Sequence, residues 1–326
     1  MSKRNKRKSN LRVSLLLLLL AAILLVTSSY AWFTANKTVT VSTLDVNVAA
    51  QNGLQISTNG TTWKSIISKA DITTGYTGAV NQLPETLAPV STGKTIDTAT
   101  GYLDMFLGDI QSNDAGDYVL TATKSLETNG TAGSFITFDM FLKVAVDTDI
   151  EMTTTSKVLT TDDKSKGIEN AARIAFVVEG NVANGAAATD IQGLHGATPD
   201  TTYIWEPNYN VHTPAAISHA LNTYGITTTA DAATAVSCDG IIAAISKDEN
   251  IKVGDATAAK NATKLATVTT DYQTRSDYSE NVQIFSLKAG ITKVRMYMWI
   301  EGQDVDCQDD ASGSNISFDL QLTVKE

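Results

Sequence analysis

Alternation of apolar and polar residues is the feature of this sequence that most restricts its fold. It is clearest over residues 315–324, where every second residue is apolar: Ile316, Phe318, Leu320, Leu322 and Val324. A period of two places all of these side chains on one face of an extended chain. We therefore expect a strand here with one face in a core and the other face polar.

Further runs of this kind predict more strands. The strongest covers residues 135–146 and places these side chains on one face, with Asp139 and Lys143 on the other: Phe138, Met140, Leu142, Val144 and Val146. Other runs are residues 102–107, 118–123, 171–178 (with Arg173 as its one charge), 282–287 and 292–300. Strands at both ends of the chain argue against a parallel α/β sheet. The predicted fold class is all-β, an antiparallel sandwich of jelly-roll or Greek-key type.

The middle of the chain has a different composition. Residues 181–200 are rich in Ala, Gly, Asn and Asp, which is typical of a surface loop. Residues 214–272 are rich in Ala and Thr, and short helices are expected around residues 215–221 and 232–246. We interpret residues 51–326 as one β-sandwich domain with a loop- and helix-containing insertion at about 181–275.

The N-terminus has the three parts of an export signal. A basic block is followed by an apolar core over residues 13–26 and then by small and polar residues up to Ala31. The segment is a cleaved signal peptide or, if Tyr30 to Phe33 are included, a retained membrane anchor. Both interpretations of residues 1–31 place the rest of the chain outside the cytoplasm, at the cell surface or beyond it.

The charge balance narrows the range of partners. The chain has 25 basic and 35 acidic side chains, and six of the basic ones lie in the leader, so the remainder has a net charge of −16. Nucleic acid and anionic lipid both need clustered Lys and Arg. We therefore expect no nucleic-acid partner, and contact with a membrane only through the N-terminal segment.

The segment directly behind the leader, residues 32–50, is expected to form a strand with these apolar residues at alternating positions: Val39, Val41, Leu44, Val46 and Val48. The alternation slips once at Ser42–Thr43, which indicates a bulge or two short strands. A strand freed by cleavage has no upstream partner and can add to a neighbouring subunit as a donor strand. Alternatively, it pairs within its own sheet.

Two groups of residues resemble a known family. The leader ends in Tyr-Ala-Trp-Phe-Thr and is followed by Thr43-Leu44-Asp45-Val46, as in TasA and camelysin-like exported fibre proteins of Gram-positive bacteria, whose precursors are cut by a SipW-type signal peptidase. Residues 134–143, 171–176 and 298–307 are similar to segments of surface proteins with this kind of leader. The resemblance implies a jelly-roll sandwich, and assembly in which the N-terminal strand inserts into the next subunit.

No catalytic set can be assembled from the sequence. It has three scattered histidines and lacks the Gly-x-Ser-x-Gly and His-Glu-x-x-His motifs. Cys238 and Cys307 do not form a Cys-x-x-Cys motif; in an exported protein they are candidates for a disulfide, although spacing alone leaves the pairing open. We expect the protein not to be an enzyme.

Two binding sites are weaker candidates. The densest acidic cluster could hold calcium through hard oxygen ligands, or it could simply be a solvated turn: Glu301, Asp304, Asp306, Asp309 and Asp310. No other cofactor is indicated. A group of aromatic side chains in the insertion, Tyr203, Trp205 and Tyr209, could stack on a sugar.

Together these patterns predict an exported structural protein of the cell surface. It would be a subunit of an extracellular fibre or biofilm matrix, with itself or other surface proteins as its partners. The alternative is a cell-surface adhesin or carbohydrate-binding module.

Overall fold

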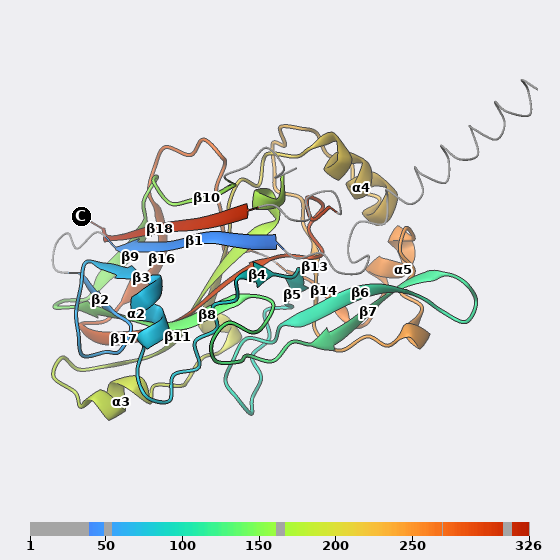
Figure 1. The fold of residues 1–326 in the computed structure, drawn as a ribbon. Helices are drawn as coiled ribbons and strands as arrows, with labels where there is room; N and C mark the ends of the chain where they lie inside the picture. Colours follow the sequence, from blue (N-terminus) through green and yellow to red (C-terminus); the bar gives the residue numbers. More distant parts are fainter. Residues whose placement is uncertain (1–38, 49–53, 161–166, 269, 309–314, 326) are drawn as a thin grey trace, which may run out of the picture.

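Two large sheets form most of the chain in the computed structural model, which describes residues 39–48, 54–160, 167–268, 270–308 and 315–325, and side chains from residue 54 onward (Figure 1). The expected leader, residues 1–31, lies outside the described residues. Within them, no helix has the length and hydropathy that crossing a bilayer requires.

Sheet A contains the first and the last described strands side by side. Its order is β16 (Val282–Leu287), β9 (Thr148–Met152), β18 (Asn315–Val324), β1 (Val39–Val48) and β3 (Ile66–Ser68). In addition, β10 (Lys157–Thr160) pairs with β18, and β4 (Thr86–Leu87) pairs with β1. The β1–β18 pair is parallel, whereas the other pairs of this sheet are antiparallel.

Sheet B is built from longer strands. Its order is β15 (Tyr272–Gln273), β12 (Thr202–Glu206), β11 (Ala172–Val182), β17 (Gly290–Ile300), β8 (Ile136–Val144) and β2 (Gln55–Ser57). All its neighbours are antiparallel except β12 and β15. The expected insertion therefore contributes two strands, β12 and β15, to this sheet.

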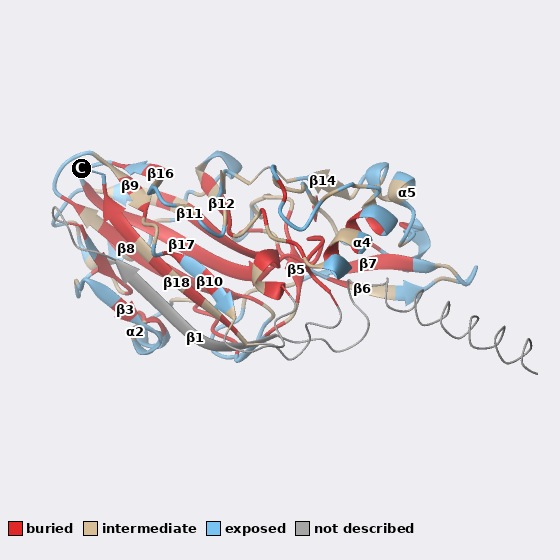
Figure 2. Cartoon of the chain, turned by 90° about the horizontal axis from the view of Figure 1, so that it is seen from above, coloured by how far each residue is buried: buried red, intermediate tan, exposed pale blue. Residues whose placement is uncertain are grey.

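The two sheets share one hydrophobic core. It joins side chains of sheet A, such as Ile150 and Phe318, to side chains of sheet B, such as Met140, Phe176 and Met296. Buried residues run along β8, β17 and β18 (Figure 2). The all-β prediction is confirmed, and so is the inward face of β18, whose five alternating apolar residues are all buried.

The outer face of sheet B is also covered, which the sequence did not predict. A second apolar cluster lies there, around Phe135, Tyr297 and Trp299. For the same reason Asp139, expected on a polar face, is only 3% exposed. Val146 was predicted to lie in the core but is 68% exposed, because β8 ends at Val144.

Shorter elements complete the described chain. One small sheet contains β5 (Val90–Ser91), β6 (Phe106–Ser112) and β7 (Tyr118–Lys124), and another pairs β13 (Asp239–Ile241) with β14 (Leu265–Thr267). The α-helices are α2 (Lys69–Thr74), α3 (Ala188–Gln192), α4 (Pro214–Tyr224) and α5 (Ala256–Lys260); the 3-10 turns are η1 (Ile168–Ala171), η2 (Pro199–Thr201) and η3 (Lys247–Glu249).

The two helices expected in the insertion had different outcomes. The helix predicted around residues 215–221 is α4, which begins at its cap Thr213 and ends at Gly225 in a left-handed conformation. The helix predicted over residues 232–246 was wrong. That segment instead contains β13, which pairs with β14, so strand pairing prevails over the helix propensity of the alanines.

Candidate functional site

The N-terminal strand β1 occupies an internal position in sheet A. It pairs with β18 from Thr40↔Asn315 to Val48↔Leu322, and the register shifts between Val41 and Thr43. The bulge predicted at this point is confirmed. On its other side β1 is held by three residue pairs with β3 and two with β4. The chain segment expected to act as a donor strand thus lies in its own sheet here, between the last strand and two short strands.

The predicted acidic loop is buried rather than solvated, so the expectation of a solvated turn was wrong for the three acids that the structure describes. Glu301, Asp304 and Asp306 are 3%, 4% and 1% exposed. The Glu301 carboxylate accepts a bond from the Trp299 indole nitrogen at 3.1 Å. The Asp304 carboxylate lies 2.5 Å from Arg173. The three acids therefore face different internal partners.

No group of three or more His, Cys, Asp or Glu side chains in the described part of the chain is arranged to hold a metal ion. Asp309 and Asp310, the other two members of the predicted cluster, lie outside the described residues. Calcium binding by this loop stays a prediction.

Arg173 on β11 organises the charges around this loop. Its guanidinium is buried and donates to Glu206 at 3.0 Å as well as to Asp304. Burial opposes its charge, but the two carboxylates more than compensate, so the pKa of Arg173 is raised. This single cation fixes the end of β12 to the segment after β17.

A buried His–Asp pair lies beside the Arg173 group. His212 Nδ1 is 2.7 Å from Asp306 Oδ2. Burial raises the pKa of Asp306 to about 7. For His212 burial lowers the pKa, but the bond to Asp306 and the charges of Asp306, Asp304 and Glu206 together outweigh it, so the net shift is upward. The pair therefore binds protons more tightly in the folded chain than its isolated groups would.

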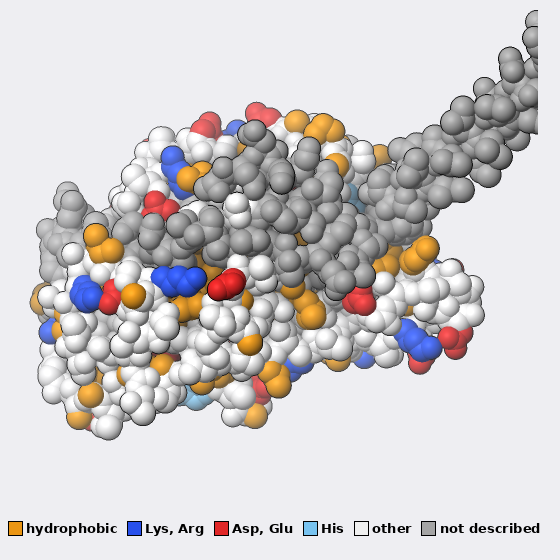
Figure 3. Space-filling view, viewed as in Figure 1, with side chains coloured by type: hydrophobic (Ala, Val, Ile, Leu, Met, Phe, Trp, Pro, Cys, Tyr) orange, Lys and Arg blue, Asp and Glu red, His pale blue; other side chains and the backbone are white. Residues whose placement is uncertain are grey.

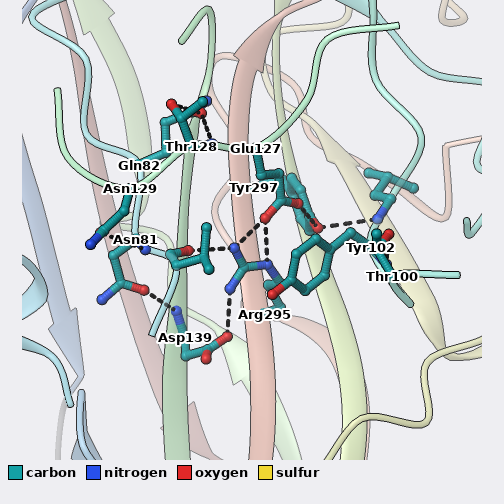
Figure 4. Close-up of polar contacts among 12 residues, drawn as sticks. Asn81, Gln82, Thr100, Tyr102, Glu127, Thr128, Asn129, Asp139, Arg295 and Tyr297 are labelled. Carbon is teal, nitrogen blue, oxygen red and sulfur yellow. Dashed lines mark hydrogen bonds and ion pairs between the residues drawn. The ribbon is translucent and has the colours of Figure 1, made fainter. Parts of the chain in front are cut away.

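A second buried cation, Arg295, lies on the outer face of sheet B (Figure 4). Its Nη1 donates to Asp139 on β8 at 2.7 Å, its Nε to Glu127 at 3.1 Å, and its Nη2 to the Val80 carbonyl at 2.6 Å. Tyr102 lies with its ring centroid 4.4 Å from the guanidinium carbon. Arg295 therefore connects β17 to three segments that cover the sheet.

The carboxylates around Arg295 differ in their environments. Burial raises the pKa of Glu127, and Arg295 only partly offsets this. Burial acts in the same direction on Asp139, but the charges of Arg295 and Lys293 outweigh it and lower its pKa. The Tyr297 hydroxyl donates to Glu127 at 2.5 Å. Because the guanidinium already has partners on all three nitrogens, we interpret this group as a structural connection.

The three aromatic ligand candidates are not brought together. Tyr203 stacks on Phe285 with ring centroids 5.7 Å apart, and the Tyr209 backbone N–H donates to the Thr274 carbonyl at 3.2 Å. Trp205 is fully buried, and its indole nitrogen donates to Thr274 at 3.0 Å. Trp205 lines a cavity of about 310 Å³ that also borders β10, and neither Tyr203 nor Tyr209 lines this cavity.

The thiol of Cys238 is free in the structure, so the candidate disulfide with Cys307 is not formed there. Cys307 is buried. Burial raises the pKa of the Cys238 thiol, which keeps it protonated and unreactive at neutral pH. Cys238 also borders a cavity of about 250 Å³ between α4 and α5.

Sequence reasoning missed both buried arginine groups. A signal was present, because Arg173 is the one charge of residues 171–178 and Arg295 the one charge of residues 294–300, two otherwise apolar runs. A charge in such a position is buried only when it is paired. Their partners, Glu206 and Glu127, are far away in the sequence and could not be identified from it.

Comparison with known proteins adds no assignment: no family model, no curated protein and no solved structure matches this chain.

Proposed function

We propose that the protein is an exported structural subunit of the cell surface, which joins its neighbours in an extracellular fibre or biofilm matrix by exchanging β1. The observation that carries the proposal is the place of β1 in sheet A. It follows directly on the expected leader, yet it pairs with the last strand over eight residue pairs. The resemblance to TasA and camelysin-like proteins supports the same assembly.

Strand exchange fits this topology. Because β1 is the first of the described strands, it can leave its position without unthreading any other described strand. Its departure would expose the backbone groups of β18 and the five buried apolar side chains of the same strand. An extended strand from another chain could then pair with this open edge and cover these side chains. Only five residue pairs, with β3 and β4, hold the opposite edge of β1.

The described part of the face in Figure 3 also favours a strand over a flat apolar patch as the joining element. On the face seen in Figure 3, the described hydrophobic side chains lie singly or in small groups among polar ones. Association through a surface patch would need a large contiguous apolar area. The proposed partners are copies of the chain itself or other surface proteins. We propose that the chain reaches the membrane only through the N-terminal segment. The proposed fold is a sandwich of jelly-roll type.

The proposal is tested with the chain that begins at residue 32, compared with the same chain lacking residues 32–48. We expect filaments by electron microscopy from the first and none from the second. A synthetic peptide of residues 37–48 should bind the shortened chain, and a scrambled peptide of the same composition should not. A shortened chain that stays folded and ignores the peptide would contradict strand exchange. Mass spectrometry of the native N-terminus would show whether the leader is cut.

A cell-surface adhesin or carbohydrate-binding module is the second candidate function. The cavity beside Trp205 favours it, because concave sites with a few polar groups on an apolar floor are typical of small-ligand binding.

A further inference from the structure

We propose that the cavity beside β10 binds an N-acetylated sugar, with the acetamido group of the sugar hydrogen-bonded to the outer edge of this strand. The cavity is lined by β10, which pairs with β18 on the side opposite to β1; the three strands are seen in Figure 1. The proposal is therefore independent of strand exchange and goes beyond the structural role.

The edge of β10 supplies the backbone part of the site. On the side of β18 that faces β10, Gln321 bonds to Ser156 through both its backbone N–H and its C=O. Since backbone groups alternate in direction along a strand, Lys157 and Leu159 bond to β18, and Val158 and Thr160 point away from it. The Asn208 amide, 3.5 Å from the Val158 carbonyl, lies on that outer side.

The outward N–H groups of Val158 and Thr160 are available for a ligand, whereas the Val158 carbonyl accepts from Asn208. Among the described residues, no backbone group accepts from the N–H of Val158 or Thr160. Five consecutive residues, 156–160, border the cavity, as expected when a strand presents its edge to it. An unpaired strand edge is normally covered or blocked. Here it faces a cavity of about 310 Å³.

The other walls have the chemistry of a sugar site. The floor is apolar, with Trp205 and Pro207, and the sides carry hydroxyl and amide groups, which both donate and accept: Ser156, Thr160, Asn170, Asn208, Thr274 and Ser276. Lys157 and Glu169 are the charged side chains of the lining, one of each sign. An uncharged ligand with many hydroxyl groups matches this lining best.

The strand edge selects among such ligands. The N–H and C=O of a trans acetamido group point in opposite directions, so its C=O can accept from the outward N–H of Val158 or Thr160 while its N–H faces the polar groups across the cavity. An extended peptide would form a longer series of backbone hydrogen bonds than a sugar. In β10, however, only Val158 and Thr160 have backbone groups that point away from β18 and towards the cavity. We therefore favour the sugar over a peptide.

The test uses the full chain in a sugar-free polyoxyethylene detergent and follows binding by saturation-transfer NMR. The two probes are the methyl β-glycosides of N-acetylglucosamine and of glucose, which differ only in the acetamido group. We expect the first probe to bind and the second to bind at least about tenfold more weakly, as the loss of one or two hydrogen bonds implies. Equal binding of the two sugars, or no binding of either, would overturn the proposal.

Two variants locate the site. Asn208→Gly removes the amide but keeps the backbone, because Asn208 has a φ of 53° that glycine readily adopts. Thr160→Val removes the hydroxyl and keeps a β-branched residue in the strand. Each should weaken binding several-fold, whereas the control Val146→Thr, at an exposed position that does not line the cavity, should not.

Thermal unfolding checks that each variant is folded. If Asn208→Gly does not fold, Thr160→Val still tests the site. Unchanged binding in the folded variants would place the sugar elsewhere and overturn the assignment. Capture of extended peptides, with no sugar bound, would assign the edge to strand addition instead.

Discussion

The two large sheets of this protein are held together in different ways. In sheet B, β17 lies between β11 and β8 and pairs with them over ten and nine residues. In sheet A, the longest pairing joins β1 to β18, and the remaining neighbours contribute between two and five pairs each. Buried arginine groups add side-chain connections on sheet B, around Arg173 and Arg295.

This contrast suggests a division of roles. Sheet B forms a continuous platform whose strands can separate only if the core opens. Sheet A is assembled around a strand that comes from the chain terminus, so its pairing can be replaced without disturbing the platform. If the sheets have these two roles, changes to them should have effects on stability and exchange that differ in size.

The largest difference should appear in amide hydrogen exchange. Residues 294–298, in the centre of β17, should exchange only through global unfolding, which for a domain costs about 5–15 kcal/mol. The amides of β3 should exchange through local opening at a small fraction of that free energy, because β3 pairs only with β1, over three residues. Similar protection of the two strands, measured by mass spectrometry or NMR, would remove the distinction between the sheets.

Removing the cation on sheet B should have the next largest effect. Arg295→Met would leave Glu127 buried without a counter-charge and Asp139 with Lys293, at 3.2 Å, as its remaining cation; the two carboxylate side chains are 5% and 4% exposed. We expect the free energy of unfolding to fall by about 3–5 kcal/mol, measured by urea denaturation.

A compensating variant separates charge from packing in that experiment. Adding Glu127→Gln to Arg295→Met removes the unpaired charge, while Asp139 keeps Lys293, and should restore part of the lost stability. If the single variant unfolds at the urea concentration of the original chain, the guanidinium does not hold the covering segments to β17.

A smaller effect is expected from Asp306, at the end of sheet B. A carboxyl whose pKa is raised in the folded state stabilises the protein at low pH, and that stabilisation is lost as the pH rises from about 4, its unfolded value, to about 7. The raised pKa of His212 likewise makes the folded state less stable as the pH rises, but at higher pH than Asp306 does. Asp306→Asn should therefore flatten the pH dependence of stability between pH 4 and 7, by about 2–4 kcal/mol. An unchanged urea midpoint profile in the variant would contradict this.

Local patterns in the sequence were enough to predict much of the fold. The alternation of Phe318 and its neighbours identified β18 and its buried face, and the slip at Ser42–Thr43 identified the bulge of β1. These features depend only on the two-residue period of a strand. The parallel pairing of β1 with β18 could not be predicted in this way, because it joins residues about 275 positions apart in the sequence.

The sites were less predictable for the same reason. The sequence identified Asp304 and Asp306 as acidic residues close together, but burial and distant partners decide what such groups do. Arg173, which binds Asp304, lies 131 residues away from it. The sugar site depends on the edge of β10 meeting Trp205 and Asn208, and this contact arises only from the fold.

The smallest effect is expected at an ion pair on the surface. Lys288 lies 2.8 Å from Asp147, about the same distance as Arg295 from Asp139, but the Lys288 and Asp147 side chains are 78% and 60% exposed. Water solvates both partners after either is removed, so the two charges gain little from each other. Lys288→Met should leave the urea midpoint unchanged within the scatter of repeat measurements. If it destabilises as much as Arg295→Met, the contact distance rather than the burial would govern these pairs, and the buried arginines would no longer distinguish sheet B from sheet A.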